Sequence, residues 1–207
     1  MTAGAAVTKP RPRIYLAGPE VFLAQAREAG ATKRHLCAQA GLEGVYPLDG
    51  ELVLDGLDKH EQARRISLEC ETMMRSCDAV IANLTPFRGV SADVGTAFEV
   101  GFMRALGRPI FGYTNTPLLY HRRSEIYRAG PRLAYDGDKP DVVIEDFDLS
   151  ENLMITIAIE ASGSRLVTHQ AAVDQEMTDL GGFIQCLDEA RQLLFAGAPG
   201  QAPTLLG

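Results

Sequence analysis

The sequence contains no long apolar run and no excess of positive charge, and each absence excludes a class of protein. No window approaches the roughly 18 uninterrupted apolar residues of a membrane-spanning helix, so we predict no membrane span. Residues 1–12 lack the apolar core of a signal peptide and are expected to form a disordered lead-in. With 27 acidic against 20 basic side chains and a net charge of −7, the chain is not expected to bind nucleic acid, which requires a basic face.

Cysteine is scarce and scattered. The four cysteines, at positions 37, 70, 77 and 186, form no C-x-x-C pair, and no histidine stands at metal-ligand spacing from them. We therefore predict no metal site. Reduced thiols are typical of cytoplasmic proteins, and the cytoplasm is where we expect this chain to act.

Several familiar site motifs are also missing. The turn in YLAGPEVF is not G-x-G-x-x-G, and no GKS or GKT follows it, which disfavours a dinucleotide site and a P-loop. Ser91 has no G-x-S-x-G context, so a serine-hydrolase elbow is disfavoured as well. The turn at Gly18 remains a candidate cradle for a phosphate or a sugar, or a simple connection between a strand and a helix.

The pattern that is present alternates strands with helices. Apolar, strand-like runs occupy 13–17, 44–48, 78–84 and 108–114, and helical patterns occupy 20–40, 60–76, 93–106, 151–162 and 183–195. This alternation predicts a single α/β domain over 13–195, built as an open parallel sheet with helices on both faces. Residues 115–150, rich in proline, glycine and aspartate, are expected to form a long excursion, and residues 196–207 a flexible tail.

Two acids stand where ligands bind in such folds, beyond the carboxyl ends of the strands. Asp93 ends a loop that follows an apolar strand, and Glu99 lies in the apolar helix after it. The helix N-terminus favours a charged carboxylate while apolar neighbours withhold water from it. A carboxylate that is ionised yet thinly hydrated is a competent nucleophile. A simpler interpretation makes Asp93 a helix cap and leaves Glu99 solvated or bonded to a neighbouring amide.

Five segments, in order, carry a resemblance to a known family. They are IYLAGPEVF (14–22), YPLDGE (46–51), CDAVIANLTPFRG (77–89), SADVGTAFEVG (91–101) and ENLM (151–154). Together they resemble the nucleoside 2-deoxyribosyltransferases. The resemblance implies a flavodoxin-like fold, no cofactor, and homo-oligomers whose sites are completed across a subunit interface. It also implies exchange of the base of a 2′-deoxynucleoside for a free nucleobase through a covalent deoxyribosyl-enzyme.

The resemblance implies roles for four residues. Glu99 matches the nucleophile that attacks the anomeric carbon, and Tyr15 matches a tyrosine whose hydroxyl can orient that carboxylate. Asp93 matches the acid that holds the 5′-hydroxyl of the sugar. Asn152 matches an asparagine that the neighbouring subunit lends to the same hydroxyl. A carboxylate nucleophile gives a double displacement with retention.

The proton donor for the leaving base is the point where the chain departs from the family. Many relatives carry Asp or Asn at the position of Cys70, which Glu69 and Glu71 flank here. Glu71, then Glu51, then Glu69 are the candidate acids, and a water molecule is the alternative. Glu51 also stands where the family often has a residue that faces the base.

Two alternatives to base exchange stay open. One is hydrolysis of a nucleoside or nucleotide N-glycosidic bond; related nucleotide hydrolases have serine in place of Asp93, whose charge would repel a 5′-phosphate. The other is a nucleoside-binding module that has lost turnover, which the departure at Cys70 favours.

Overall fold

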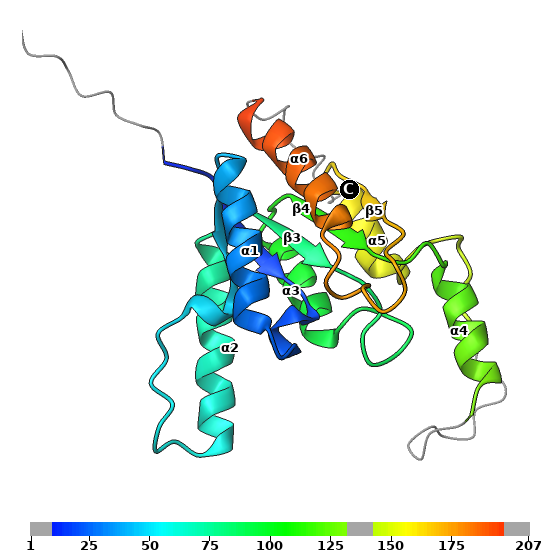
Figure 1. The fold of residues 1–207 in the computed structure, drawn as a ribbon, viewed down its shortest axis with the longest axis horizontal. Coiled ribbons are helices and arrows are strands. Elements are labelled where there is room, and N and C mark those ends of the chain that lie inside the picture. Colours follow the sequence, from blue (N-terminus) through cyan, green and yellow to red (C-terminus); the bar gives the residue numbers. More distant parts are fainter. Residues whose placement is uncertain (1–9, 132–142, 197–207) are drawn as a thin grey trace, which may run out of the picture.

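A five-stranded parallel sheet forms the centre of the molecule in the computed structural model, which describes residues 10–131 and 143–196 (Figure 1). The strands lie in the order β2-β1-β3-β4-β5, and their bounds are β1 Arg13–Ala17, β2 Glu43–Val45, β3 Ala79–Asn83, β4 Ile110–Thr114 and β5 Leu166–Thr168. All four pairings are parallel. This is the strand order of flavodoxin-like, doubly wound sheets, so the predicted fold class is confirmed.

Helices cover both faces of the sheet. One face packs against α1 (Ala26–Gln39) and α6 (Gly181–Phe195), and the other against α2 (Lys59–Arg75), α3 (Val94–Ala105) and α5 (Leu153–Glu160). A further helix, α4 (Tyr120–Ala129), stands away from these layers, at the right of the view in Figure 1. The sheet is therefore the middle layer of a three-layer sandwich.

Alternation along the strands decides which side chains each layer receives. Ile14 and Leu16 of β1 join the core under α1 and α6, whereas Tyr15 and Ala17 join the core under α2, α3 and α5. Because β1 is buried on both faces, it is apolar at every position after Arg13 apart from the hydroxyl of Tyr15. That hydroxyl is consequently delivered to the layer that contains α3.

Two predicted elements are wrong at their ends. The strand expected over 44–48 stops at Val45, because Pro47 has no amide hydrogen to donate and opens a short 3-10 turn, η2 (Pro47–Asp49). The helix expected over 20–40 is two elements, the 3-10 turn η1 (Pro19–Phe22) and then α1. Extended backbone at Leu23 separates them.

Two elements were not predicted. Helix α4 lies within the excursion expected over 115–150, and β5 is a three-residue strand at the sheet edge. The predicted lead-in and tail lie mostly outside the described residues. Within the described part of the chain, none of the helices combines the length and the apolar character that crossing a lipid bilayer requires.

Candidate active site

Tyr15 and Glu99, both predicted as catalytic, meet between the sheet and α3. Tyr15 is fully buried on the sheet face that α2 and α3 cover. Its hydroxyl donates a hydrogen bond of 2.6 Å to Oε1 of Glu99, which is half-buried in the second turn of α3. Hydroxyl–carboxylate hydrogen bonds are short and roughly twice as strong as neutral ones. The tyrosine therefore fixes the position of the carboxylate.

The surroundings of Glu99 raise the pKa of its carboxyl group to about 7. Burial is the largest cause, because it withholds water from the charged form, and the charges of Asp93 and Glu20 act in the same direction. The hydrogen bond from Tyr15 opposes them. Burial and the charge of Glu99 raise the pKa of Tyr15, so its hydroxyl keeps its proton and remains a donor. Near neutral pH, Glu99 thus exists in both protonation states.

Asp93 is the N-cap of α3. Its Oδ2 accepts hydrogen bonds from the amides of Gly95 (2.9 Å) and Thr96 (3.2 Å), which satisfies two donors at the helix start. A Cβ atom at position 95 would lie 2.9 Å from Oδ2, so glycine leaves room for the cap. The capping role of the simpler interpretation is present, but it uses one carboxylate oxygen and leaves Asp93 half-buried, close enough to influence Glu99.

Cys70 of α2 lies beside Tyr15. The thiol is half-buried, and burial raises its pKa, whereas the hydrogen bond with the hydroxyl of Tyr15 lowers it. The negative charges of Glu99 and Glu69 also raise it. Position 70 is therefore part of the site, and its thiol is neutral at neutral pH.

The three candidate acids differ in their surroundings. The side chain of Glu69 packs against the turn after η2, where a Cβ atom on Gly50 would lie 2.9 Å from its Cγ. Glu71 lies 3.9 Å from Arg75 in an ion pair on the same helix. Glu51 is exposed. Of the three, Glu69 is the one whose charge acts on a residue in contact with Tyr15.

Gly18 lies against a carboxylate of the protein itself. A Cβ atom at position 18 would fall 2.0 Å from Oε2 of Glu20 and 2.9 Å from Cβ of Asn83. The space that glycine leaves is therefore occupied by buried side chains. This close approach explains glycine at position 18 by packing alone, independently of the predicted binding of substrate.

Glu20 belongs to a buried ionic network that sequence analysis missed. Its Oε1 accepts hydrogen bonds from Lys33, from Asn83 (2.8 Å) and from Tyr113 (3.2 Å), and all four residues are almost inaccessible to solvent. Lys33 also donates to the hydroxyl of Tyr113 at 2.9 Å. Lys33 belongs to α1, 13 residues after Glu20, so no short sequence motif predicts their contact. The network sits at the ends of β3 and β4, and its carboxylate contributes to the raised pKa of Glu99.

Two loops at the carboxyl edge of the sheet present aromatic rings to solvent. Phe22 of η1 and Phe87 of the 85–93 loop are stacked, with centroids 5.5 Å apart and planes at 10°. The guanidinium of Arg88 lies 4.7 Å and 4.6 Å from the two ring centroids. Phe22 is 52% exposed. Sequence analysis placed both loops at the site but did not single out these rings.

Asn152 is the N-cap of α5 and is half-buried. Its side-chain oxygen accepts from the amide of Met154 at 3.0 Å, and its Nδ2 donates to Oε2 of Glu145 at 2.9 Å. The structure contains one chain, so the role predicted for Asn152 in a neighbouring site stays a prediction.

One group of side chains within residues 10–131 and 143–196 has metal-ligand chemistry. Ligand atoms of His121, Asp146 and Asp148 all lie within 4.8 Å of one another. Both aspartates are exposed, and Nδ1 of His121 lies 3.1 Å from Oδ1 of Asp146. His121 is half-buried, and exposed aspartates commonly gather without an ion, so we assign no metal to this group.

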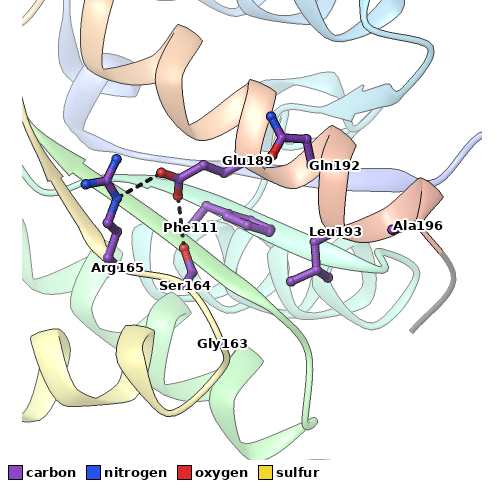
Figure 2. A pocket seen from close by; sticks show the side chains of 8 residues that line it. All are labelled: Phe111, Gly163, Ser164, Arg165, Glu189, Gln192, Leu193 and Ala196. Carbon is purple, nitrogen blue, oxygen red and sulfur yellow. Dashed lines mark hydrogen bonds and ion pairs between the residues drawn. The ribbon is translucent and has the colours of Figure 1, made fainter. Parts of the chain in front are cut away.

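A hollow of about 500 Å³ lies away from these residues, between α6 and the segment before β5 (Figure 2). Three of its polar side chains bind one another, because Glu189 accepts from Arg165 (3.0 Å) and from Ser164 (3.4 Å). It contains none of the predicted site residues. The candidate active site is therefore defined by the Tyr15–Glu99 pair and not by this hollow.

Comparison with known proteins connects this geometry to a family. The sequence profile described as nucleoside 2-deoxyribosyltransferase matches residues 14–154. A Schizosaccharomyces pombe protein described as uncharacterized is 31% identical over 186 residues, which cover 79% of this chain and 87% of the relative. A solved 2-deoxyribosyltransferase from Leishmania mexicana is 32% identical, covers 70% of this chain and 85% of its own, and superposes with a TM-score of 0.50. A conserved protein from Enterococcus faecalis V583 shares the fold at 18% identity, over 87% of this chain and 99% of its own, with a TM-score of 0.50.

Proposed function

Because the chain belongs to the nucleoside 2-deoxyribosyltransferase family, we propose that it exchanges the base of a 2′-deoxynucleoside through a covalent deoxyribosyl intermediate on Glu99. The observation that carries the proposal is the contact between Tyr15 and a Glu99 carboxylate that is thinly hydrated but still ionisable near neutral pH. Such a group combines nucleophilicity with availability at physiological pH. No cofactor is needed for this chemistry.

The reaction proceeds in two displacements. An Oε atom of Glu99 attacks C1′ of the sugar, the C1′–N bond breaks, and its electron pair leaves with the base, which takes up a proton. A nitrogen of the incoming base then attacks C1′ and loses its proton, and the carboxylate leaves. Two inversions at C1′ retain the configuration. The hydroxyl of Tyr15 holds the carboxylate in place throughout.

Glu69 is the proton donor to the leaving base in this proposal. Its side chain packs against the turn at Gly50, and it precedes Cys70, which contacts Tyr15. The neutral Cys70 thiol has a raised pKa and is therefore a weak acid. Glu71 instead faces Arg75 on its own helix, at 3.9 Å.

Each end of the substrate has a complementary surface. The free Asp93 oxygen accepts a hydrogen bond from the 5′-hydroxyl of the sugar, because the cap of α3 uses Oδ2. The exposed ring of Phe22, with Phe87 behind it, offers a face on which a nucleobase can stack. Glu51, exposed at the turn after η2, can reach polar groups of the base.

We further propose that the active form is a homo-oligomer in which Asn152 enters the neighbouring site. Helices α3 and α5 pack together and expose four large apolar side chains: Val94 (85%), Phe98 (57%), Met154 (72%) and Ile157 (48%). Contiguous exposed apolar side chains of this kind mark protein–protein interfaces. The same two helices carry Asp93 and Asn152 at their N-termini, so an interface here places both residues beside it.

The cysteines support a cytoplasmic location. All four are free thiols, and three of them are buried. Structural free thiols persist in a reducing compartment.

Intact-protein mass spectrometry with a 2-deoxy-2-fluoro nucleoside tests the nucleophile. The wild-type chain is expected to gain the mass of one fluorodeoxyribosyl group, and Glu99→Gln is expected to gain none. Glu125→Gln, which changes an exposed carboxylate on α4, serves as the matched control and should form the adduct like wild type.

Incubation with 2′-deoxyinosine and adenine tests the transfer. Formation of 2′-deoxyadenosine by wild type and not by Glu99→Gln supports base exchange. Release of free base and deoxyribose alone would assign the chain to nucleoside hydrolysis. Absence of both adduct and turnover would leave a nucleoside-binding module.

A further inference from the structure

We propose that the buried pair Arg123–Glu151 is a positioning unit that fixes two parts of the sugar site at once: the loop that ends at Asp93 and the helix start that carries Asn152. This inference rests on the proposed function, because it assigns both ends of the pair to binding of the 5′-hydroxyl. Neither residue touches the substrate in this proposal, and each acts through the backbone that it holds.

Arg123 anchors α4 to the rest of the domain. The helix stands apart from the layers of the sandwich (Figure 1), yet the side chain of Arg123 is only 8% exposed. Its guanidinium donates to the backbone oxygens of Val90 (2.7 Å), Leu118 and Ser150 (2.9 Å), and to Oε2 of Glu151 at 3.0 Å. One side chain thus joins the 85–93 loop to the segment that precedes α5.

Glu151 completes the connection from the other side. It is fully buried, and its Oε1 accepts from the hydroxyl of Ser91 and from the amide of Asn152 at 3.0 Å. Its backbone oxygen accepts from Thr156 at 3.0 Å, which ties it to α5. The carboxylate therefore contacts Ser91, two positions before Asp93, and Asn152, which enters the neighbouring site in the proposed function.

Stability alone is a poor explanation for such a pair. Removing two charges from water is costly, and a buried ion pair is often replaceable by apolar side chains without loss of stability. What apolar side chains cannot supply is a set of directed hydrogen bonds to two separate backbone segments. The geometry therefore points to positioning, with Arg123 and Glu151 setting the relative placement of Asp93 in one site and Asn152 in the next.

Three adjacent basic side chains, at positions 121–123, have separate surroundings in this arrangement. His121 lies near Asp146 and is half-buried, Arg122 pairs with Glu125 at the surface, and Arg123 turns inward to Glu151. A phosphate-binding patch would need several of these side chains to face one ligand. The structure instead separates Arg123 from its two neighbours.

The test compares two substrates that differ only at the sugar hydroxyl. Wild type, Glu151→Gln and Ser91→Ala are assayed for kcat/KM with 2′-deoxyinosine and with 2′,5′-dideoxyinosine, which lacks the 5′-hydroxyl. A hydrogen bond to a charged group corresponds to about 10- to 100-fold, so wild type should prefer 2′-deoxyinosine by about that factor. In Glu151→Gln the preference should shrink about tenfold, because activity falls on 2′-deoxyinosine while activity on the dideoxy substrate changes little. Equal losses on both substrates would overturn the proposal.

Hydrogen exchange supplies a readout that does not depend on turnover. Glu151→Gln and Ser91→Ala should speed exchange in both the 85–93 loop and the 150–154 segment, whereas acceleration in one segment alone would refute the coupling. Ser91→Ala removes one hydroxyl from a half-buried position and keeps the test available if Glu151→Gln does not fold. Arg122→Met, which breaks the exposed pair with Glu125 in the same helix, is the control and should match wild type in both measurements.

Failure of the proposed function and failure of the positioning role give different results in these experiments. If wild type forms neither product nor adduct from either nucleoside, the assignment to sugar binding falls with the proposed function, and hydrogen exchange still decides whether the two segments move as one. If wild type is active and the preference for the 5′-hydroxyl survives in Glu151→Gln, the positioning role alone is refuted.

Discussion

Replacing Glu99 by glutamine is expected to stabilise the folded protein at pH 8 and to leave its stability nearly unchanged at pH 4.5. The carboxyl group of Glu99 titrates at about 7 in the folded chain against an ordinary value of 4.5. Folding therefore favours its protonated form. The stability that this preference contributes is complete below about pH 4.5 and is lost as the pH rises through about 7.

The magnitude follows from the separation of the two pKa values. It corresponds to a loss of up to about 3 kcal/mol in the free energy of unfolding between pH 4.5 and pH 8. Glutamine carries no charge at either pH, keeps nearly the same shape, and still offers an oxygen to the hydroxyl of Tyr15. The variant thus removes the cost of an ionised, thinly hydrated carboxylate and little else. For a chain of this size, about 3 kcal/mol corresponds to a rise in Tm of about 6–12 °C at pH 8.

Urea unfolding of wild type and Glu99→Gln at pH 4.5, 6 and 8 is the assay. The difference between the two unfolding free energies at each pH cancels the titration of every other group, so only its change with pH is interpreted. Glu125→Gln, at an exposed carboxylate, should show a difference from wild type that is small at all three values. If the difference for Glu99→Gln is constant from pH 4.5 to pH 8, then Glu99 is well hydrated and the argument for a poised nucleophile fails.

Two further predictions concern residues around Glu99, the proposed nucleophile. Tyr15→Phe removes the hydrogen bond that lowers the pKa of Glu99, so the acid limb of the kcat/KM profile between pH 5 and 9 should move to higher pH. Activity at pH 7 should therefore fall more than activity at pH 9. An acid limb at the same pH as in wild type would contradict the role of Tyr15. Glu99→Ala and Asn152→Ala are each expected to be inactive, and mixing them under conditions in which subunits exchange should restore up to about a quarter of wild-type activity. About one site in four then combines an intact Glu99 with an intact Asn152 from the neighbouring subunit. No recovery after exchange would place Asn152 in its own site.

The fold was predictable because its signals are local. Each buried strand is a short apolar run, so the ends of β1, β3 and β4 were predicted to within about two residues. The crossover helices show apolar side chains at helical spacing. Strand β5 was missed because three residues are too few to show a pattern. Helix α4 was missed because its apolar side chains follow no single face, and its attachment depends on Arg123.

The candidate site was predictable only in part. Asp93 and Glu99 share one short segment, and Tyr15 lies opposite them because β1 alternates. The partners of Glu20 and Glu151 were not predictable, because Lys33 and Arg123 come from separate helices. Whether a carboxylate is buried depends on such distant partners, and no local pattern records them.

The electrostatics that prepare Glu99 also bear on which substrates it can accept. The charge of Glu20 is matched by Lys33, whereas Asp93 is held by backbone amides, and its charge raises the pKa of Glu99. A phosphate on the 5′-oxygen would bring further negative charge to the side where Asp93 lies, and like charges at close range disfavour binding. The same charge would raise the pKa of Glu99 further, because every nearby anion favours the protonated carboxyl group. We therefore expect a nucleotide to bind weakly and to suppress the ionised form of Glu99, which is the reactive form in the proposed mechanism. The expected preference for a nucleoside has the same electrostatic cause as the raised pKa of Glu99, and replacing Asp93 by serine should relax both effects together.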